Sequence, residues 1–139
     1  MAAFNKINDF VEQLGLAVHN LNTDLCKVAL TNTAPVATNT IFANITEISA
    51  GNGYTAGGDD STNTWSENPA GTGEMVCVDV VWTASGGSIG PFRYVVFYND
   101  TPSSPVDPLI GWWDHGSGVT LADTETFTVD FGANTITIS

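Results

Sequence analysis

The residues best suited to chemistry lie in the segment WWDHGSG, residues 112–118. Asp114 directly precedes His115, and a carboxylate beside an imidazole can orient the ring to act as a general base, with Ser117 close in sequence. Adjacent residues of a strand point to opposite faces, however, and this segment contains no GxSxG turn around Ser117. The segment therefore predicts a surface Asp–His pair near a turn, and we expect no catalytic residues.

Acidic side chains form a second group that could bind a ligand. Asp59 and Asp60 lie in a loop-rich region, and Asp24, Glu67 or Asp107 could come near them in the fold. Calcium takes several oxygen ligands from a shaped loop, but the DxDxDG spacing is absent, so we expect a solvated acidic loop without metal. The phosphate-binding motifs GxGxxG and GxxxxGK[ST] are also absent, so nothing favours a nucleotide cofactor.

Tryptophan residues offer a third possibility, because flat aromatic rings can stack on sugar rings. Trp65, Trp112 and Trp113 all have acidic residues nearby in the sequence. This pattern leaves open a module that binds glycans on a host surface. The loop-rich region that contains Trp65 could bind such a glycan or a divalent ion.

The elements that would position these residues centre on residues 74–98. Two runs rich in valine and aromatic residues flank a connector of small residues, which predicts a β-hairpin with a longer loop. With symmetric pairing, Arg93 would lie opposite Trp82, although Asp100 or Asp114 could also bind it. A sheet covered on one side alternates apolar with polar residues, whereas both faces of this hairpin are largely apolar. We therefore expect a central hairpin, covered by the core and by a second layer or a neighbouring subunit.

The one helix that the sequence predicts covers residues 3–20, where apolar residues recur at helical spacing. Its apolar stripe must pack against the β body or against a partner. His19 would then act as a C-terminal cap. The stripe consists of Phe4, Ile7, Phe10, Val11, Leu14 and Val18.

The remaining residues, 24–139, are expected to complete a single domain as a β body. The alternation is cleanest in residues 126–131, where Phe127, Val129 and Phe131 share one face. About seven short strands with turns between them are typical of an antiparallel β-sandwich or barrel, here jelly-roll-like. Strands are predicted over residues 24–31, 40–49, 109–116, 119–121, 126–131 and 133–139, with a short strand around 62–66 and long loops over 50–73 and 99–108.

Composition argues against several classes of partner. The 139 residues include 3 lysines and arginines against 15 aspartates and glutamates, a net charge of −12. That charge repels phosphate backbones and anionic lipids, so neither nucleic acid nor a membrane is an expected partner. Polar residues interrupt the N-terminal segment where a signal peptide would be apolar, which favours folding in a cytoplasm. Cys26 and Cys77, in apolar strand-like runs, are expected to be reduced and buried.

Four motifs spread along the chain are specific as a set: ALTNTAP, GNGYTAGG, GPFRY and TLADTETFTV. Together with their flanking residues they resemble a family of short proteins encoded among the structural genes of tailed bacteriophages. The likeness spans nearly the whole chain except residues 59–73. The resemblance implies a structural protein of the virion, supplies no catalytic residue, and leaves open a place on the capsid or on the tail.

The expected function is that of a capsid decoration, or cement, protein that binds the major capsid protein on the outside of a phage head. Such a protein assembles in the host cytoplasm, stabilises the head, and needs closed symmetry to sit on a symmetry axis, so a homo-oligomer is expected, with a trimer favoured. A tail or head–tail component and a host-surface or glycan-binding module are the alternatives, and an enzyme is not expected. The candidate interface residues are Phe4, Ile7, Phe10, Leu14, Trp82, Phe92, Tyr94, Trp112 and Trp113.

Overall fold

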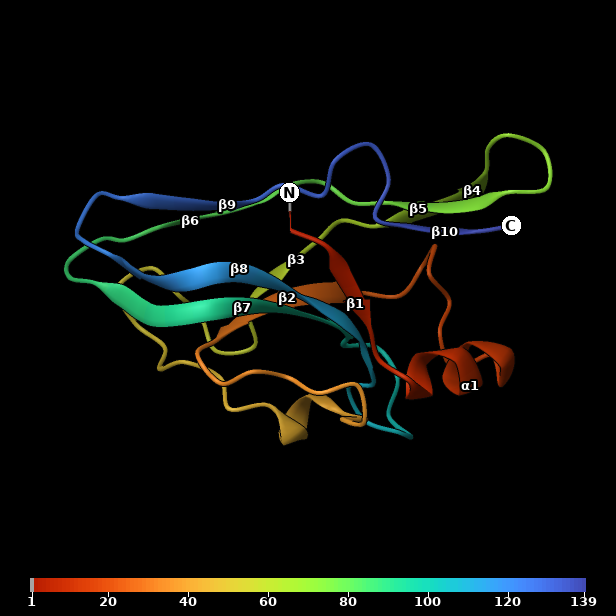
Figure 1. The fold of residues 1–139 in the computed structure, drawn as a ribbon, viewed down its shortest axis with the longest axis horizontal. Coiled ribbons are helices and arrows are strands. Elements are labelled where there is room, and N and C mark those ends of the chain that lie inside the picture. The colour runs from red at the N-terminus through yellow and green to blue at the C-terminus, as the bar shows by residue number, and fades with distance from the viewer. Residues whose placement is uncertain (1) are drawn as a thin grey trace.

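A computed structural model describes residues 2–139 as two layers of antiparallel strands (Figure 1). The predicted fold class, a mainly β sandwich with one helix near the N-terminus, is confirmed. The first layer is one sheet with the strand order β1 (Phe4–Lys6), β8 (Leu109–Leu121), β7 (Ile89–Asn99), β2 (Cys26–Thr31) and β3 (Asp59–Asp60).

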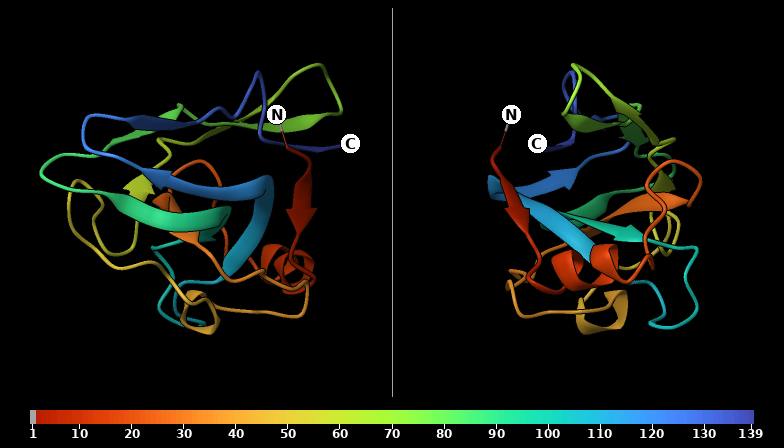
Figure 2. Two further views of the ribbon diagram at one scale, coloured as in Figure 1. Left: turned by 60° about the vertical axis from the view of Figure 1, so that its left-hand side comes forward. Right: turned by 90° about the vertical axis from the view of Figure 1, so that its right-hand side faces the viewer.

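The second layer holds two smaller sheets. One has the order β10 (Ile136–Ile138), β5 (Gly73–Val76) and β4 (Thr64–Glu67), and the other pairs β6 (Val80–Thr83) with β9 (Thr126–Val129). The helix α1 (Asp9–Gly15) lies beside β1 and β8 at one end of the first sheet (Figure 2). A short 3₁₀ helix, η1 (Phe42–Asn44), completes the elements, and neither helix is long and apolar enough to span a membrane.

The core lies between the two layers and is rich in aromatic rings. Val95 of β7 pairs with Trp113 of β8 in the first layer. From the second layer, the ring of Phe131 lies 6.1 Å from that of Phe97 and 5.8 Å from that of Trp113, measured between centroids. These rings are buried, and aromatic pairs at such distances add to the stabilisation from burial alone.

The outer face of the first sheet is covered by the chain itself. Phe42 of η1 stacks on Tyr98 of β7 with ring centroids 4.2 Å apart, and the Tyr98 hydroxyl donates to the backbone oxygen of Gly57 at 2.6 Å. The expectation that both faces of residues 74–98 are covered holds only in part: Val95, Val96, Phe97 and Tyr98 are buried, whereas Arg93 and Tyr94 are half-buried and Val78 and Val81 are exposed. Residues from the segment 32–58 cover the outer face of β7. The sequence predicted either a second layer or a neighbouring subunit in that place.

The hairpin predicted over residues 74–98 is wrong. Its first run becomes β5 and β6 of the second layer, while its second run becomes β7 of the first. The connector is tied to a distant loop: the Asn52 oxygen accepts from the Ser85 N–H, and the Asn52 amide donates to the Ser88 oxygen, both at 2.9 Å. These bonds hold the connector where the chain crosses from the second layer to the first. The runs on either side of it, β5–β6 and β7, therefore do not pair with each other. Val81 of β6 is consequently 53% exposed.

The helix predicted over residues 3–20 is too long at both ends. Residues before α1 form β1, in which Phe4 pairs with Trp113 across the edge of β8. Backbone pairing there satisfies hydrogen bonds that a helix would otherwise supply. Beyond α1, Ala17 has a φ of 60°, a left-handed conformation that ends an α-helix.

The apolar stripe of that segment is divided between the core and solvent. Ile7 and Phe10 are buried, and the Ile7 N–H donates to the Ile110 oxygen at 3.0 Å. Val11, on the same helix, is 57% exposed. The stripe therefore docks on the chain's own β body through only part of its predicted length.

Two further strand predictions need correction. Residues 40–49 form η1 and irregular chain, because the side-chain oxygen Oδ1 of Asn44 accepts from the Thr40 N–H at 3.0 Å and favours a tight turn. The turn predicted within residues 116–118 is absent: β8 continues to Leu121, which pairs with Ile89. The strands β2, β9 and β10 lie within their predicted ranges, and β4 overlaps the strand predicted around residues 62–66.

Candidate functional site

Asp114 and His115 do not form a catalytic pair. Asp114 accepts hydrogen bonds from Arg93 at 2.8 and 3.0 Å and from the Gly116 N–H at 2.8 Å, and these bonds, Arg93 first, lower the pKa of Asp114. The His115 ring packs instead against Phe127 of β9, with centroids 5.4 Å apart. The Asp114 carboxylate therefore binds the Arg93 guanidinium, and the His115 imidazole packs on Phe127 instead of being oriented by Asp114.

Arg93 has a structural role on the sheet surface. Its partner is Asp114, one of the two carboxylates that the sequence allowed, and its guanidinium carbon lies 5.4 Å from the centroid of the Tyr94 ring. The alternative contact with Trp82 is wrong, because that indole is buried in the second layer. Asp100 binds Lys27 at 2.9 Å.

The acidic residues considered for calcium are spread over the molecule. Asp59 and Asp60 form β3 at the edge of the first sheet, and Asp24 accepts from the side-chain amide of Asn99 at 2.7 Å. Burial, followed by the charge of Asp100, raises the pKa of Asp107. Within residues 2–139, no group of three or more His, Cys, Asp or Glu side chains is placed to hold a metal ion.

The three tryptophans do not share a surface that could stack on a sugar. Trp113 is buried, whereas Trp112 is half-buried and, as its neighbour on β8, points to the other face of the sheet. Trp65 lies in the second layer, half-buried, with its ring directly over Gly73. Stacking of one glycan on all three rings would require them on one face, so these tryptophans do not form a shared sugar-binding surface.

A buried polar cluster joins segments that are distant in sequence. The Asn99 amide donates to Asp24 at 2.7 Å and faces Nδ1 of His19 at 3.1 Å, while its oxygen accepts from the Thr101 N–H at 3.1 Å. This arrangement makes Nδ1 of His19 an acceptor. Burial lowers the pKa of His19 to about 4, and the nearby Asp24 and Asp9 oppose that shift.

The predicted capping role of His19 is wrong, since α1 ends four residues earlier, at Gly15. No local pattern could have revealed the cluster, because Asn99 lies on β7, far along the chain. His19 and Asn99 are buried, whereas Asp24 is half-buried and Thr101 is exposed, and every polar contact named here is within the chain, so we assign the cluster a structural role.

Cys26 and Cys77 are buried free thiols, as predicted. Burial is the largest cause that raises the pKa of each thiol. Neither sulfur is placed to act as a nucleophile, because the reactive form is the exposed thiolate.

Most of the candidate interface residues belong to the chain's own core or its margin. In this conformation only the half-buried members could also touch a partner. The buried members are Ile7, Phe10, Trp82, Phe92 and Trp113, and the half-buried members are Phe4, Leu14, Tyr94 and Trp112.

The outer face of the sheet formed by β6 and β9 is exposed and uncharged. Val81 pairs with Thr128, and Thr83 pairs with Thr126, and all four side chains point to solvent. We call these four residues the Val–Thr face. The alternation of residues 126–131 places Thr126 and Thr128 away from the core, but nothing in the sequence pairs them with Val81 and Thr83.

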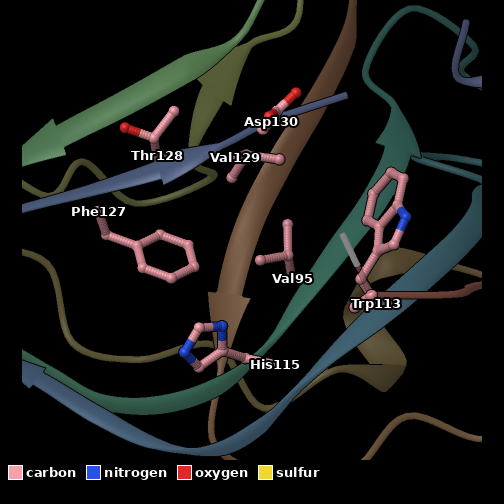
Figure 3. A pocket seen from close by; sticks show the side chains of 8 residues that line it. Val95, Trp113, His115, Phe127, Thr128, Val129 and Asp130 are labelled. Carbon is pink, nitrogen blue, oxygen red and sulfur yellow. The ribbon is translucent and has the colours of Figure 1, made fainter. Parts of the chain in front are cut away.

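A cavity of about 150 Å³ opens between β8 and β9 (Figure 3). The apolar side chains of Phe127 and Val129 point from β9 toward Val95, Trp113 and His115 on the opposite layer. The remaining lining residues are Ala2, Thr128 and Asp130. No sequence pattern predicts this cavity, because it depends on the pairing of β6 with β9, whereas the sequence favours pairing of β6 with β7.

Comparisons with protein-family models, with curated proteins and with solved structures found no match.

Proposed function

We propose that this chain is a structural protein of a tailed-bacteriophage virion and that it decorates the outside of the head, where it binds the major capsid protein. The phage assignment rests on the resemblance of the four motifs ALTNTAP, GNGYTAGG, GPFRY and TLADTETFTV. Its role is mechanical: the protein adds contacts that hold the shell against the pressure of packaged DNA.

The observation that carries the docking role is the Val–Thr face. It lacks ionisable side chains in a chain with a net charge of −12, and Glu125 and Asp130 flank it in sequence. Interface centres are depleted of charged residues and surrounded by polar rims. Burying Val81 and three threonine methyl groups would remove apolar area from water without desolvating a charge.

The excess of acidic residues also fits a decoration protein. Repulsion between copies keeps a protein soluble and monodisperse until it docks. Contacts made by the Val–Thr face are not ionic, so binding to heads should persist at moderate salt, where screening weakens exposed charge pairs.

A symmetric homo-oligomer, with a trimer favoured, belongs to this proposal. The outer face of β7 no longer calls for a neighbouring subunit, because residues 32–58 cover it. The half-buried residues Phe4 and Trp112 remain available at the margin of the first sheet. Light scattering should give an oligomer in solution or after docking, and a strict monomer in both states would contradict this part.

The test is the location and effect of the protein on particles. Quantitative mass spectrometry of purified virions should give the many copies expected of a decoration protein, and heads that lack it should release DNA at lower temperature. Particles of unchanged heat stability, with labelling confined to the tail, would replace this proposal with the tail alternative. Binding to host glycans without virions would favour the glycan-binding module.

A matched pair of variants tests the face itself. Val81→Asp should abolish docking, because it buries a carboxylate at the proposed contact. Val36→Asp places the same charge on a valine that is similarly exposed, at 51%, on the covering loop, and should dock normally. Equal docking by both variants would exclude the Val–Thr face as the contact surface.

A further inference from the structure

We propose that the cavity between β8 and β9 is a docking site for one aromatic side chain of another protein, carried on an extended segment with basic residues beside it. The occupant is thus defined by three features: a flat ring, a strand-like backbone and flanking positive charge. Each follows from a different property of the cavity and its mouth.

The size and walls of the cavity fit a single ring. Its volume of about 150 Å³ matches that of apolar cavities of about 150 Å³ that bind benzene. Phe127 and Trp113 form two of its walls, and aromatic walls favour an aromatic guest through edge-to-face contacts. Val95 and Val129 add aliphatic surface to the lining.

The mouth lies between two strands that each keep an unpaired edge within residues 2–139. β1 pairs with β8 only at residues 111–113, so β8 has no partner on that side from Asp114 onward. β9 pairs only with β6, and no residue of β6 lines the cavity. Unpaired edges bind extended segments through backbone hydrogen bonds, while a pocket beside them selects the side chain.

The surroundings of the mouth select positive charge. Asp130 lies among the lining residues and is exposed, and Figure 3 shows its carboxylate pointing away from the cavity. A basic residue next to the inserted ring would meet this carboxylate outside the cavity. The net charge of −12 also attracts a basic segment and repels an acidic one.

This inference goes beyond the proposed function and stands without it. A segment of a coat protein could supply the ring, but peptide binding to the isolated protein is a property of the cavity alone. Thr128 belongs both to the Val–Thr face and to the cavity lining, but Val81 lies only on the face and Trp113 only at the cavity, so loss of docking in Val81→Asp and loss of peptide binding remain distinguishable results.

The experiment titrates the isotope-labelled full chain with three blocked pentapeptides, followed by NMR. Acetyl-Gly-Lys-Phe-Lys-Gly-amide should shift the Trp113 indole, the His115 ring and the Val95 methyl signals. Replacing phenylalanine by alanine should weaken binding by about tenfold or more, as is usual for an aromatic anchor. Replacing both lysines by glutamate should weaken it severalfold.

Three results would overturn the proposal. These are equal binding of the phenylalanine and alanine peptides, signal changes confined to another surface, and no change with the phenylalanine peptide at millimolar concentration. Acetyl-phenylalaninamide serves as a further arm: if it binds as tightly as the pentapeptide, the site takes a free aromatic molecule and not a segment.

A matched pair of charge variants locates the basic residue. Asp130→Asn should weaken binding about twofold, the size expected for one exposed charge pair, and the amide oxygen can keep the bond that Gly132 donates. Glu12→Gln removes the same charge from α1, away from the mouth, and should leave the affinity unchanged. Equal weakening in both variants would contradict the placement of the basic residue beside Asp130.

Discussion

The imidazole Nδ1 of His19 lies 3.1 Å from the side-chain nitrogen of Asn99, inside the protein and next to the ring of Phe10. The Asn99 nitrogen can only donate, so the His19 proton resides on Nε2. That atom is buried and has no partner among the described residues. The neutral ring is therefore held by one hydrogen bond and by packing.

The first prediction concerns stability against pH. Burial lowers the pKa of His19 to about 4, whereas an unfolded histidine titrates near its usual 6.5. Between these values the unfolded chain holds a proton that the folded chain lacks, so stability is full above about pH 7 and falls as the pH drops toward 4. The loss should reach about 2–3 kcal/mol, since one pKa unit corresponds to about 1.4 kcal/mol.

Chemical denaturation at several pH values measures this slope. His19→Gln keeps an acceptor for Asn99 but does not titrate, so its stability should depend less on pH in the same range. His115→Gln is the matched comparison, because it removes the other histidine, which is exposed and lies outside the buried cluster. A slope that survives His19→Gln would contradict the assignment.

The second prediction concerns α1. Phe10 is 3% exposed and packs on His19, so Phe10→Ala should lower the free energy of unfolding by about 3 kcal/mol or more. Val11→Ala, on the exposed side of the same helix, should change it by less than about 0.5 kcal/mol. Thermal or urea unfolding compares the two. Similar losses would mean that the helix docks by a different face.

The third prediction compares alanine substitutions at two glycines, one of which adds a steric clash to the backbone strain that both share. Gly58 and Gly71 both have positive φ, of 75° and 89°, so alanine at either site costs about 1 kcal/mol in strain. A Cβ on Gly58 would also overlap the backbone of Val28, whereas the space around Gly71 is open. Gly58→Ala should therefore be far more destabilising than Gly71→Ala, as calorimetry can determine.

The fourth prediction concerns the thiols. Cys26 and Cys77 should resist a water-soluble thiol reagent in the native protein and react at once in denaturant, because both are buried. Mass spectrometry of alkylated protein should find two free thiols. Fast reaction in native buffer would show that the interior opens more readily than the packing indicates.

The sequence predicted what depends on local alternation and failed where pairing is long-range. Residues 126–131 alternate cleanly, and β9 formed there with Val129 facing the core. The runs on either side of residues 84–90 looked like hairpin partners, but β6 finds its partner in β9, beyond both β7 and β8. Composition cannot distinguish a connector that turns from one that crosses between layers.

The candidate sites show the same limit. Both the cavity and the Val–Thr face depend on the pairing of β6 with β9 and on how that pair lies over β8. The sequence contained the threonines and the aromatic residues, but not the information that Phe127 would face His115. Local motifs were also misleading, as Asp114 shows: its partner Arg93 comes from the neighbouring strand.

The order of strands in the first sheet bears on how the chain is made. Among the described residues, β1 pairs with β8 and β2 pairs with β7 as well as with β3, so both strands need partners that are synthesised well after them. Until β7 has been synthesised, Val28 and Leu30 of β2 lack the neighbouring strand that helps to bury them in the folded protein. Emerging chains with such apolar strands are prone to aggregation, and slowing translation should lower the soluble yield instead of raising it.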